Sequence, residues 1–189
     1  MNKIIWPLLL CAVLCGCGGG ETGNAVQEQY RTLETARLEA EVTSHTSTDS
    51  RTFTLLCSYD ADGDAVTTVT DPGELAGLTA VVSGTDMTLS SEGLQLPAGA
   101  SLDICPANCL PYLLRALADG YVLEQSSEAL DDTPCLRLAL DTTAPGGKVL
   151  CTVWLDAEGL FPRYAEFSRN EQVVLTVKLL AFTCTTSEG

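Results

Sequence analysis

Alternation between apolar and polar residues recurs along most of the chain, and it constrains the fold more than any other feature. It is plain in residues 53–59 and 149–155, where every second residue is apolar. Turn signals such as Asp62-Gly63 and Pro145-Gly146-Gly147 separate stretches of this kind. Alternating residues lie on opposite faces of a strand, and short, evenly spaced strands pair with their neighbours along the chain. The sequence therefore predicts a mainly antiparallel sheet with an apolar face.

One clear amphipathic helix interrupts the predicted strands. Four leucines recur at helical spacing and form a single apolar stripe: Leu110, Leu113, Leu114 and Leu117. Pro111 suits the first turn of a helix, and Gly120 suits its C-terminal cap, so we expect a helix over residues 111–118. An antiparallel sheet must cover its apolar face, and this helix is the best available cover.

A second helix is expected near the start of the domain. Apolar residues from Val26 to Ala40 recur at helical spacing. Leu38, Ala40 and Val42 also alternate with polar residues, so a strand should begin before residue 40. The two patterns overlap, and the sequence leaves the boundary between helix and strand open.

The N-terminal segment has the features of a secretory leader. Residues 4–14 are almost wholly apolar, which is too short to span a bilayer as a permanent helix. The motif Leu14-Cys15-Gly16-Cys17 that follows resembles the lipobox of bacterial lipoproteins. This resemblance implies a signal peptide over residues 1–16, with Cys17 acylated as the first residue of the mature chain. The alternative is a plain secretory leader with a buried thiol.

The leader sets the expected domain organisation and location. Residues 17–25 are rich in glycine and are predicted to form a flexible tether, followed by one domain over residues 26–189. Two or more acyl chains hold a protein stably to a membrane. We therefore expect an extracytoplasmic protein that is lipid-anchored to the cell membrane.

The charge of the chain excludes one class of partner. The 189 residues include 25 acidic and 10 basic side chains, which gives a net charge of −15. A surface with this charge repels nucleic acid and anionic headgroups. The predicted contact with the membrane therefore depends on the lipid and not on a basic patch.

Six cysteines follow Cys17 in the chain: Cys57, Cys105, Cys109, Cys135, Cys151 and Cys184. An extracytoplasmic location permits disulfides, and six cysteines allow fifteen full pairings, among which the sequence does not choose. The alternative is that several are small buried hydrophobes, since Cys57 and Cys151 each alternate like core residues. Cys105 and Cys109 lie four residues apart with no histidine nearby, so a zinc site is not expected.

No arrangement of residues indicates a catalytic or metal site. His45 is the only histidine and lies in a predicted polar loop, residues 44–51, so any histidine-based triad would have to use it. The aspartates in residues 60–64 match a hairpin turn better than a calcium loop, whose glycine and last ligand are out of place.

A polar stretch after residue 120 holds the carboxylates that could form a pair of the glycosidase kind: Glu124, Glu128, Asp131 and Asp132. We interpret this stretch as a solvated strand end and loop. There is no G-x-S-x-G motif and no phosphate-binding glycine loop. We therefore expect no enzyme, no catalytic residue, no cofactor and no bound metal.

The order of predicted elements resembles the LolA/LolB-like, outer-membrane lipoprotein-sorting-like superfamily, and more narrowly its branch in Gram-positive, spore-forming bacteria such as clostridia. The motifs that carry the resemblance are Tyr59-Asp60-Ala61-Asp62-Gly63, Pro72 with Ala76-Gly77, residues 106–121, and residues 154–166. The resemblance implies an α+β, mainly antiparallel fold. In it, a curled sheet forms an incomplete β-barrel around two or three helices and encloses a hydrophobic cavity.

The resemblance also implies a function. Well-known members carry acyl chains, so we expect a lipoprotein that binds a hydrophobic ligand, a lipid or a lipoprotein acyl chain. The candidate cavity residues are Phe53, Leu55, Leu110, Leu113, Leu114 and Leu117. The alternative for the leucine stripe is a plain core with no cavity left over. The alternative function is a protein-interaction module that docks and regulates a cell-envelope or spore-cortex enzyme, as some clostridial relatives of this fold do.

Overall fold

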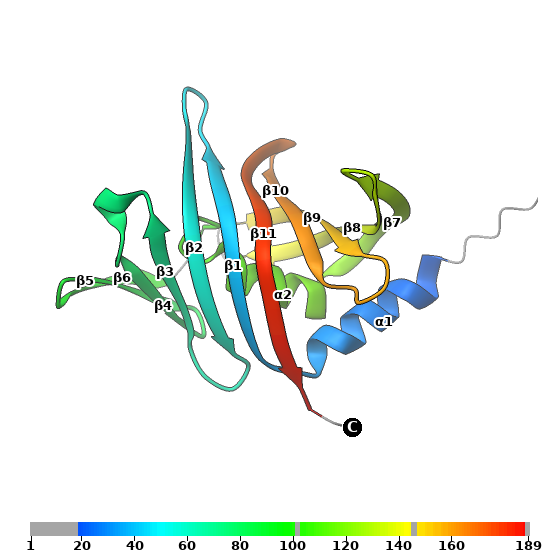
Figure 1. The fold of residues 1–189 in the computed structure, drawn as a ribbon, viewed down its shortest axis with the longest axis horizontal. Helices are drawn as coiled ribbons and strands as arrows, with labels where there is room; N and C mark the ends of the chain where they lie inside the picture. Colours follow the sequence, from blue (N-terminus) through cyan, green and yellow to red (C-terminus); the bar gives the residue numbers. More distant parts are fainter. Residues whose placement is uncertain (1–18, 101–102, 145–146, 188–189) are drawn as a thin grey trace, which may run out of the picture.

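The computed structural model describes residues 19–100, 103–144 and 147–187. Eleven strands form one antiparallel sheet, accompanied by two α-helices and one turn of 3-10 helix (Figure 1). In chain order the elements are α1 (Gly19–Arg31), β1 (Leu33–His45), β2 (Ser50–Asp60), β3 (Ala65–Asp71), η1 (Gly73–Leu75), β4 (Thr79–Ser83), β5 (Asp86–Ser91), β6 (Leu94–Ala100), α2 (Cys109–Asp119), β7 (Tyr121–Leu130), β8 (Thr133–Ala144), β9 (Gly147–Asp156), β10 (Pro162–Arg169) and β11 (Gln172–Thr186).

The sheet consists of two meanders that join at its centre. Its strand order is β6-β5-β4-β3-β2-β1-β11-β10-β9-β8-β7, so the first and last strands pair and β6 and β7 form the two edges. The β1–β11 ladder runs from Leu33 opposite Thr186 to Ser44 opposite Leu175. The sheet curls without closing, and both helices lie on its inner side (Figure 1). The predicted fold class, an incomplete antiparallel barrel around helices, is confirmed.

The core fills the space between α2 and the inner face of the sheet. The four leucines of the α2 stripe are at most 2% exposed, and they share one cluster with Leu38 of β1, Leu155 of β9 and Phe167 of β10. From α1, Val26 and Tyr30 join the same cluster. Full burial of one such side chain contributes about 1.5–3 kcal/mol to folding, so the contact between α2 and the sheet is a main source of stability.

The start of the domain differs in part from the sequence prediction. The strand β1 begins at Leu33, so the prediction of a strand that begins before residue 40 is confirmed. Residues 19–25 were predicted as part of a flexible tether, but they are helical and form the start of α1, which begins at Gly19. Gly23 is buried against β7, where a Cβ on Gly23 would lie 3.0 Å from Gln125 Oε1. This tertiary contact outweighs the low helix propensity of glycine. The predicted signal peptide and Cys17 lie outside the described residues.

Several predicted polar segments are shorter than expected because the strands continue through them. The strand β1 includes His45, which is paired with Ser50, and β7 includes Glu124 and Glu128. Polar residues can continue these strands because one face of each lies outside the core. The helix α2 is also longer than predicted, from Cys109 to Asp119.

The turn between β2 and β3 is a hairpin turn, as predicted. Ser58 of β2 pairs with Val66 of β3, and residues 61–64 connect the two strands. The Asp62 backbone N–H donates to Oδ1 of Asp60 at 3.0 Å, so this carboxylate stabilises the turn.

Gly120 is required at the end of α2. Its N–H donates to the Ala116 carbonyl at 2.8 Å, and a Cβ on Gly120 would collide with that same oxygen and lie 3.1 Å from the Leu140 Cβ. We expect Gly120→Ala to lower the free energy of unfolding by about 1–3 kcal/mol, as overpacking does. Gly73→Ala is the control, because no atom lies within 4 Å of its Cβ position. Equal urea midpoints for the two variants would contradict the close contact at Gly120.

Candidate functional site

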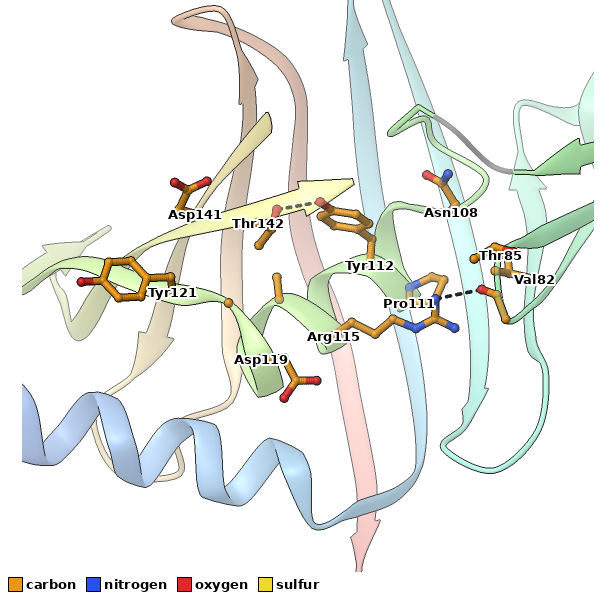
Figure 2. Close-up of a pocket in the computed structure, with 13 residues that line it drawn as sticks. Val82, Thr85, Asn108, Pro111, Tyr112, Arg115, Asp119, Tyr121, Asp141 and Thr142 are labelled. Carbon is orange, nitrogen blue, oxygen red and sulfur yellow. Dashed lines mark hydrogen bonds between the residues drawn. The ribbon is translucent and has the colours of Figure 1, made fainter. Parts of the chain in front are cut away.

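A pocket of about 510 Å³ lies between α2, the turn that links β4 and β5, and the adjoining ends of β7 and β8 (Figure 2). We call it the α2 pocket. Its apolar wall includes Val82 of β4, Pro111 and Ala116 of α2, and the ring of Tyr112. Volumes of 300–1,000 Å³ are typical of small-molecule sites, so the α2 pocket can hold a ligand of moderate size.

The two faces of α2 have different surroundings. The leucine stripe faces the core, whereas the intervening positions line the pocket: Pro111, Tyr112, Arg115, Ala116 and Asp119. Positions three and four apart share one face of a helix, so a single apolar stripe leaves the other face for the pocket. The buried leucines thus fix the helix that forms one wall.

The segment before α2 is held by Asn108. Its Oδ1 accepts from the Cys105 backbone N–H at 2.8 Å, and its Nδ2 donates to the Asp103 carbonyl at 2.8 Å. The side chain of Asn108 is buried, and these bonds satisfy both ends of its amide. They fix the entry into α2, and Asn108 itself lines the pocket.

A chain of hydroxyl groups fixes the ring of Tyr112. The Thr142 hydroxyl donates to the Val149 carbonyl at 2.9 Å, which uses its one proton. The Tyr112 hydroxyl, 2.6 Å from Thr142 Oγ1, must therefore be the donor in that pair (Figure 2). Burial raises the pKa of Tyr112, so its hydroxyl stays protonated at neutral pH. The ring packs edge-on against Phe167, 5.8 Å between centroids.

The charged groups at the rim of the α2 pocket are not equally satisfied. Asp119 pairs with Arg31 at 3.3 Å, and Asp141 Oδ2 pairs with Lys148 at 2.6 Å. Arg115 donates from Nη1 to the Gly84 carbonyl at 3.1 Å, and among the described residues it forms no ion pair (Figure 2). A guanidinium has five N–H donors, so Arg115 keeps capacity for an anionic group at the rim.

A smaller apolar pocket lies beside the α2 pocket. We call it the Phe53 pocket; it measures about 190 Å³ and is lined by Phe53 and Leu55 of β2 together with parts of β3, β4, η1 and residues 105–107. Ala80 lines this pocket and Val82, two residues on in β4, lines the α2 pocket. Cavities of about 150 Å³ can hold a molecule the size of benzene, so the Phe53 pocket suits one short apolar group.

The six predicted cavity residues occupy two kinds of place. Phe53 and Leu55 line the Phe53 pocket, and the four leucines of α2 lie in the core. The sequence prediction did not include Arg115, Tyr112 or Tyr121 of the α2 pocket. One signal was present, because Arg115 is the one charged residue in the predicted helix over residues 111–118.

The other candidates from the sequence lie away from the residues that line the α2 pocket. His45 is bonded on both ring nitrogens, Nδ1 to Ser50 at 3.0 Å and Nε2 to Thr176 at 3.3 Å. Glu124 and Glu128 both approach Arg137, at 3.0 and 3.7 Å, and Glu128 also accepts from the Trp154 indole N–H at 3.1 Å. The two glutamates thus form an ion-pair cluster across β7 and β8.

Asp131 and Asp132 complete the set of predicted carboxylates, and they form the turn between β7 and β8 with φ values of 48° and 62°. Within the described ranges, no group of three or more histidine, cysteine, aspartate or glutamate side chains is arranged to hold a metal ion. No helix of the same residues is long and apolar enough to cross a bilayer.

The six cysteines after Cys17 are free thiols, and they differ in burial. Burial raises the pKa of Cys151 to about 12 and raises that of Cys109 well above its usual range. Cys105 and Cys184 are only partly buried.

We expect iodoacetamide to alkylate Cys105 and Cys184 of the folded protein well before Cys109 and Cys151, because the first two thiols are only partly buried whereas the other two are fully buried and closed to the reagent. Peptide mass spectrometry of a time course measures the order, and the urea-denatured protein, in which all sites should react alike, is the control. Alkylation of Cys109 or Cys151 as fast as that of Cys184 would contradict the burial.

Comparison with known proteins supports the fold. No protein-family model matches the chain, and no curated protein matches it. An uncharacterized conserved protein from Thermus thermophilus superposes with a TM-score of 0.54 at 9% identity, covering 89% of this chain and 88% of that one. A DUF1329 family protein from Desulfovibrio piger gives 0.50 at 14% identity, covering 89% and 94%.

A LolA superfamily protein from Nitrosomonas europaea is a further match, with a TM-score of 0.47 at 12% identity and coverage of 88% of this chain and 94% of that one. All three likenesses concern the fold alone, since the sequences are so distant. The narrower assignment to a branch of spore-forming bacteria stays a prediction. At the level of the fold, the structures similar to this chain include lipoprotein-sorting-like proteins of the LolA superfamily.

Proposed function

We propose that the chain is a membrane-anchored, extracytoplasmic lipoprotein that binds a hydrophobic ligand, a lipid or an acyl chain, in the α2 pocket. The observation that carries the proposal is the pocket itself, about 510 Å³ with apolar walls on the inner side of a curled sheet. The predicted leader and Cys17 supply the anchor. The Phe53 pocket, of about 190 Å³, supplies a neighbouring site for a short apolar group.

The rim of the pocket favours a ligand with an anionic or polar head. Arg115 has free donors and lies on the same helix as the apolar Pro111 and Ala116. Guanidinium groups bind carboxylates and phosphates through paired hydrogen bonds. Asp141 Oδ1 is buried without a hydrogen-bond partner among the described residues, and a ligand hydroxyl could satisfy it. An amphiphile with its head at Arg115 and its tail along the wall fits both features.

We expect Arg115→Glu to weaken binding of cis-parinaric acid, a fluorescent fatty acid, by about tenfold or more, because a favourable charge contact becomes repulsive. Arg115 is exposed and makes one hydrogen bond, so the variant should fold normally. Arg163→Glu is the matched control, since it makes the same charge change outside the α2 pocket. Fluorescence titration measures the affinity. An equal loss in both variants, or no binding by the unaltered protein, would refute the proposed site.

A second candidate function is a protein-interaction module that docks and regulates a cell-envelope or spore-cortex enzyme. One observation favours it: β6 ends the sheet, and its Leu94 and Leu96 are 69% and 59% exposed. An unpaired strand edge with apolar side chains can pair with another chain. Copurification of a wall hydrolase that is lost in Leu94→Lys/Leu96→Lys, but kept in Arg115→Glu, would support this function over ligand binding.

A further inference from the structure

Covalent geometry limits the distance between the proposed lipid and one edge of the sheet. One residue separates Cys17 from Gly19, where α1 begins, and two peptide units span at most about 7 Å. The helix rises about 6 Å from Gly19 to Gly23. Gly23 packs on β7, where its Cβ position lies 3.7 Å from the Val122 side chain. The lipid-bearing residue therefore lies within about 13 Å of Gly23, the residue of α1 that packs on β7.

The edge strand β7 presents large apolar side chains next to this point. Tyr121 is 73% exposed and Leu123 is 52% exposed. The β7–β8 register shifts between Val122 and Glu124, so Leu123 is the extra residue of a bulge. Tyrosine and leucine are typical of protein surfaces that lie in the headgroup region of a bilayer. The other sheet edge, β6, has similarly exposed leucines but is separated from β7 by the nine intervening strands of the sheet.

We propose that the β7 edge, through Tyr121 and Leu123, is the surface by which the anchored protein contacts the bilayer. The inference rests on the proposed lipid anchor at Cys17. Gly120 and Tyr121 also line the α2 pocket, so this orientation places the pocket mouth at the bilayer surface. A ligand tail then passes between bilayer and pocket without crossing bulk water.

The chemistry of the contact is apolar. The chain carries a net charge of −15, and β7 itself contributes Glu124 and Glu128. Anionic headgroups repel such a surface, whereas zwitterionic headgroups do not. The occupant of the β7 edge is therefore a zwitterionic lipid surface.

The test uses the lipoprotein purified from membranes with its own processed N-terminus and placed in phosphatidylcholine vesicles. Trp154 is the one tryptophan after the predicted leader, so Trp154→Phe gives a dark background. In this Trp154→Phe background, Leu123→Trp introduces a single tryptophan at the β7 edge. The control is Leu96→Trp, at a position of similar exposure on the opposite edge. Replacing part of the lipid by acyl-brominated phosphatidylcholine should lower the fluorescence of the first variant about twofold and leave the second unchanged.

The possible results of this experiment distinguish the proposed orientation of the β7 edge from the proposed lipid anchor at Cys17. Mass spectrometry first establishes whether Cys17 carries lipid; a chain without lipid overturns the anchor and the orientation together. A lipidated chain with equal quenching at both positions, or with none at position 123, overturns the orientation alone. If Trp154→Phe does not fold, hydrogen exchange of the unaltered lipoprotein replaces it. Residues 121–130 should then exchange more slowly in vesicles than in detergent micelles, and residues 94–100 should not; equal slowing of both overturns the orientation.

Discussion

Leu114→Asp is expected to unfold the protein under conditions in which Leu114→Ala remains folded. Leu114 is 2% exposed in the core cluster between α2 and the sheet. Its truncation to alanine should lower the free energy of unfolding by about 2–5 kcal/mol. Aspartate adds the cost of an unpaired charge in an apolar environment. Domains are stable by only about 5–15 kcal/mol in total, so the aspartate variant loses most or all of this margin.

Urea denaturation followed by circular dichroism measures both variants. The control is Leu94→Asp, which makes the same chemical change at a side chain that is 69% exposed on β6. Its midpoint should stay close to that of the unaltered protein. A midpoint of Leu114→Asp equal to that of Leu94→Asp would place α2 outside the core and would remove the wall of the α2 pocket with it.

Local patterns in the sequence predicted the fold class well because both of its signals are local. Alternation with period two marked strands such as β2 and β9, and the leucine stripe marked α2. Strand length was underestimated at β7, where Glu128 looks like a loop residue but pairs with Cys135 of β8. Alternation gives no information about which distant strands pair, so the central β1–β11 ladder was not predicted.

The start of α1 was missed because its signal is tertiary. Glycines at residues 18–20 and 23 have low helix propensity, and in the sequence alone they indicate a spacer. In the fold, the missing side chain of Gly23 lets α1 approach Val122 and Gln125 of β7 closely. The same residue thus weakens a helix locally and permits its packing.

The candidate site was only partly predicted, again because much of its signal is tertiary. Phe53 and Leu55 could be found as apolar residues of a strand, and they line the smaller pocket. The α2 pocket combines side chains from α2 with those of β4, β7 and β8, which only the folded chain brings together. Its most informative residue, Arg115, is a single charge within an apolar helix, and such an exception to a pattern could have indicated a function.

Cys17→Ser is expected to release the protein from the membrane or to leave it unprocessed, because serine lacks the thiol that receives the lipid in the lipoproteins that the motif Leu14-Cys15-Gly16-Cys17 resembles. Without two or more acyl chains, no stable hold on the bilayer remains. Membrane fractionation and the mass of the mature chain measure the effect. The matched control is Cys15→Ser, which makes the same change two residues earlier in the same leader and should remain attached.

Leu114→Asp and Cys17→Ser act on separate properties of the molecule. Leu114→Asp removes the fold and should leave lipidation intact, since the leader directs that modification. Cys17→Ser removes the anchor and should leave the urea midpoint intact, since the buried cluster includes residues from Val26 onward. Binding of cis-parinaric acid by purified Cys17→Ser protein then isolates the pocket from the membrane. Membrane attachment that persists in Cys17→Ser, with an unchanged mature mass, would end the lipid-anchor proposal and leave the α2 pocket to be judged on ligand binding alone.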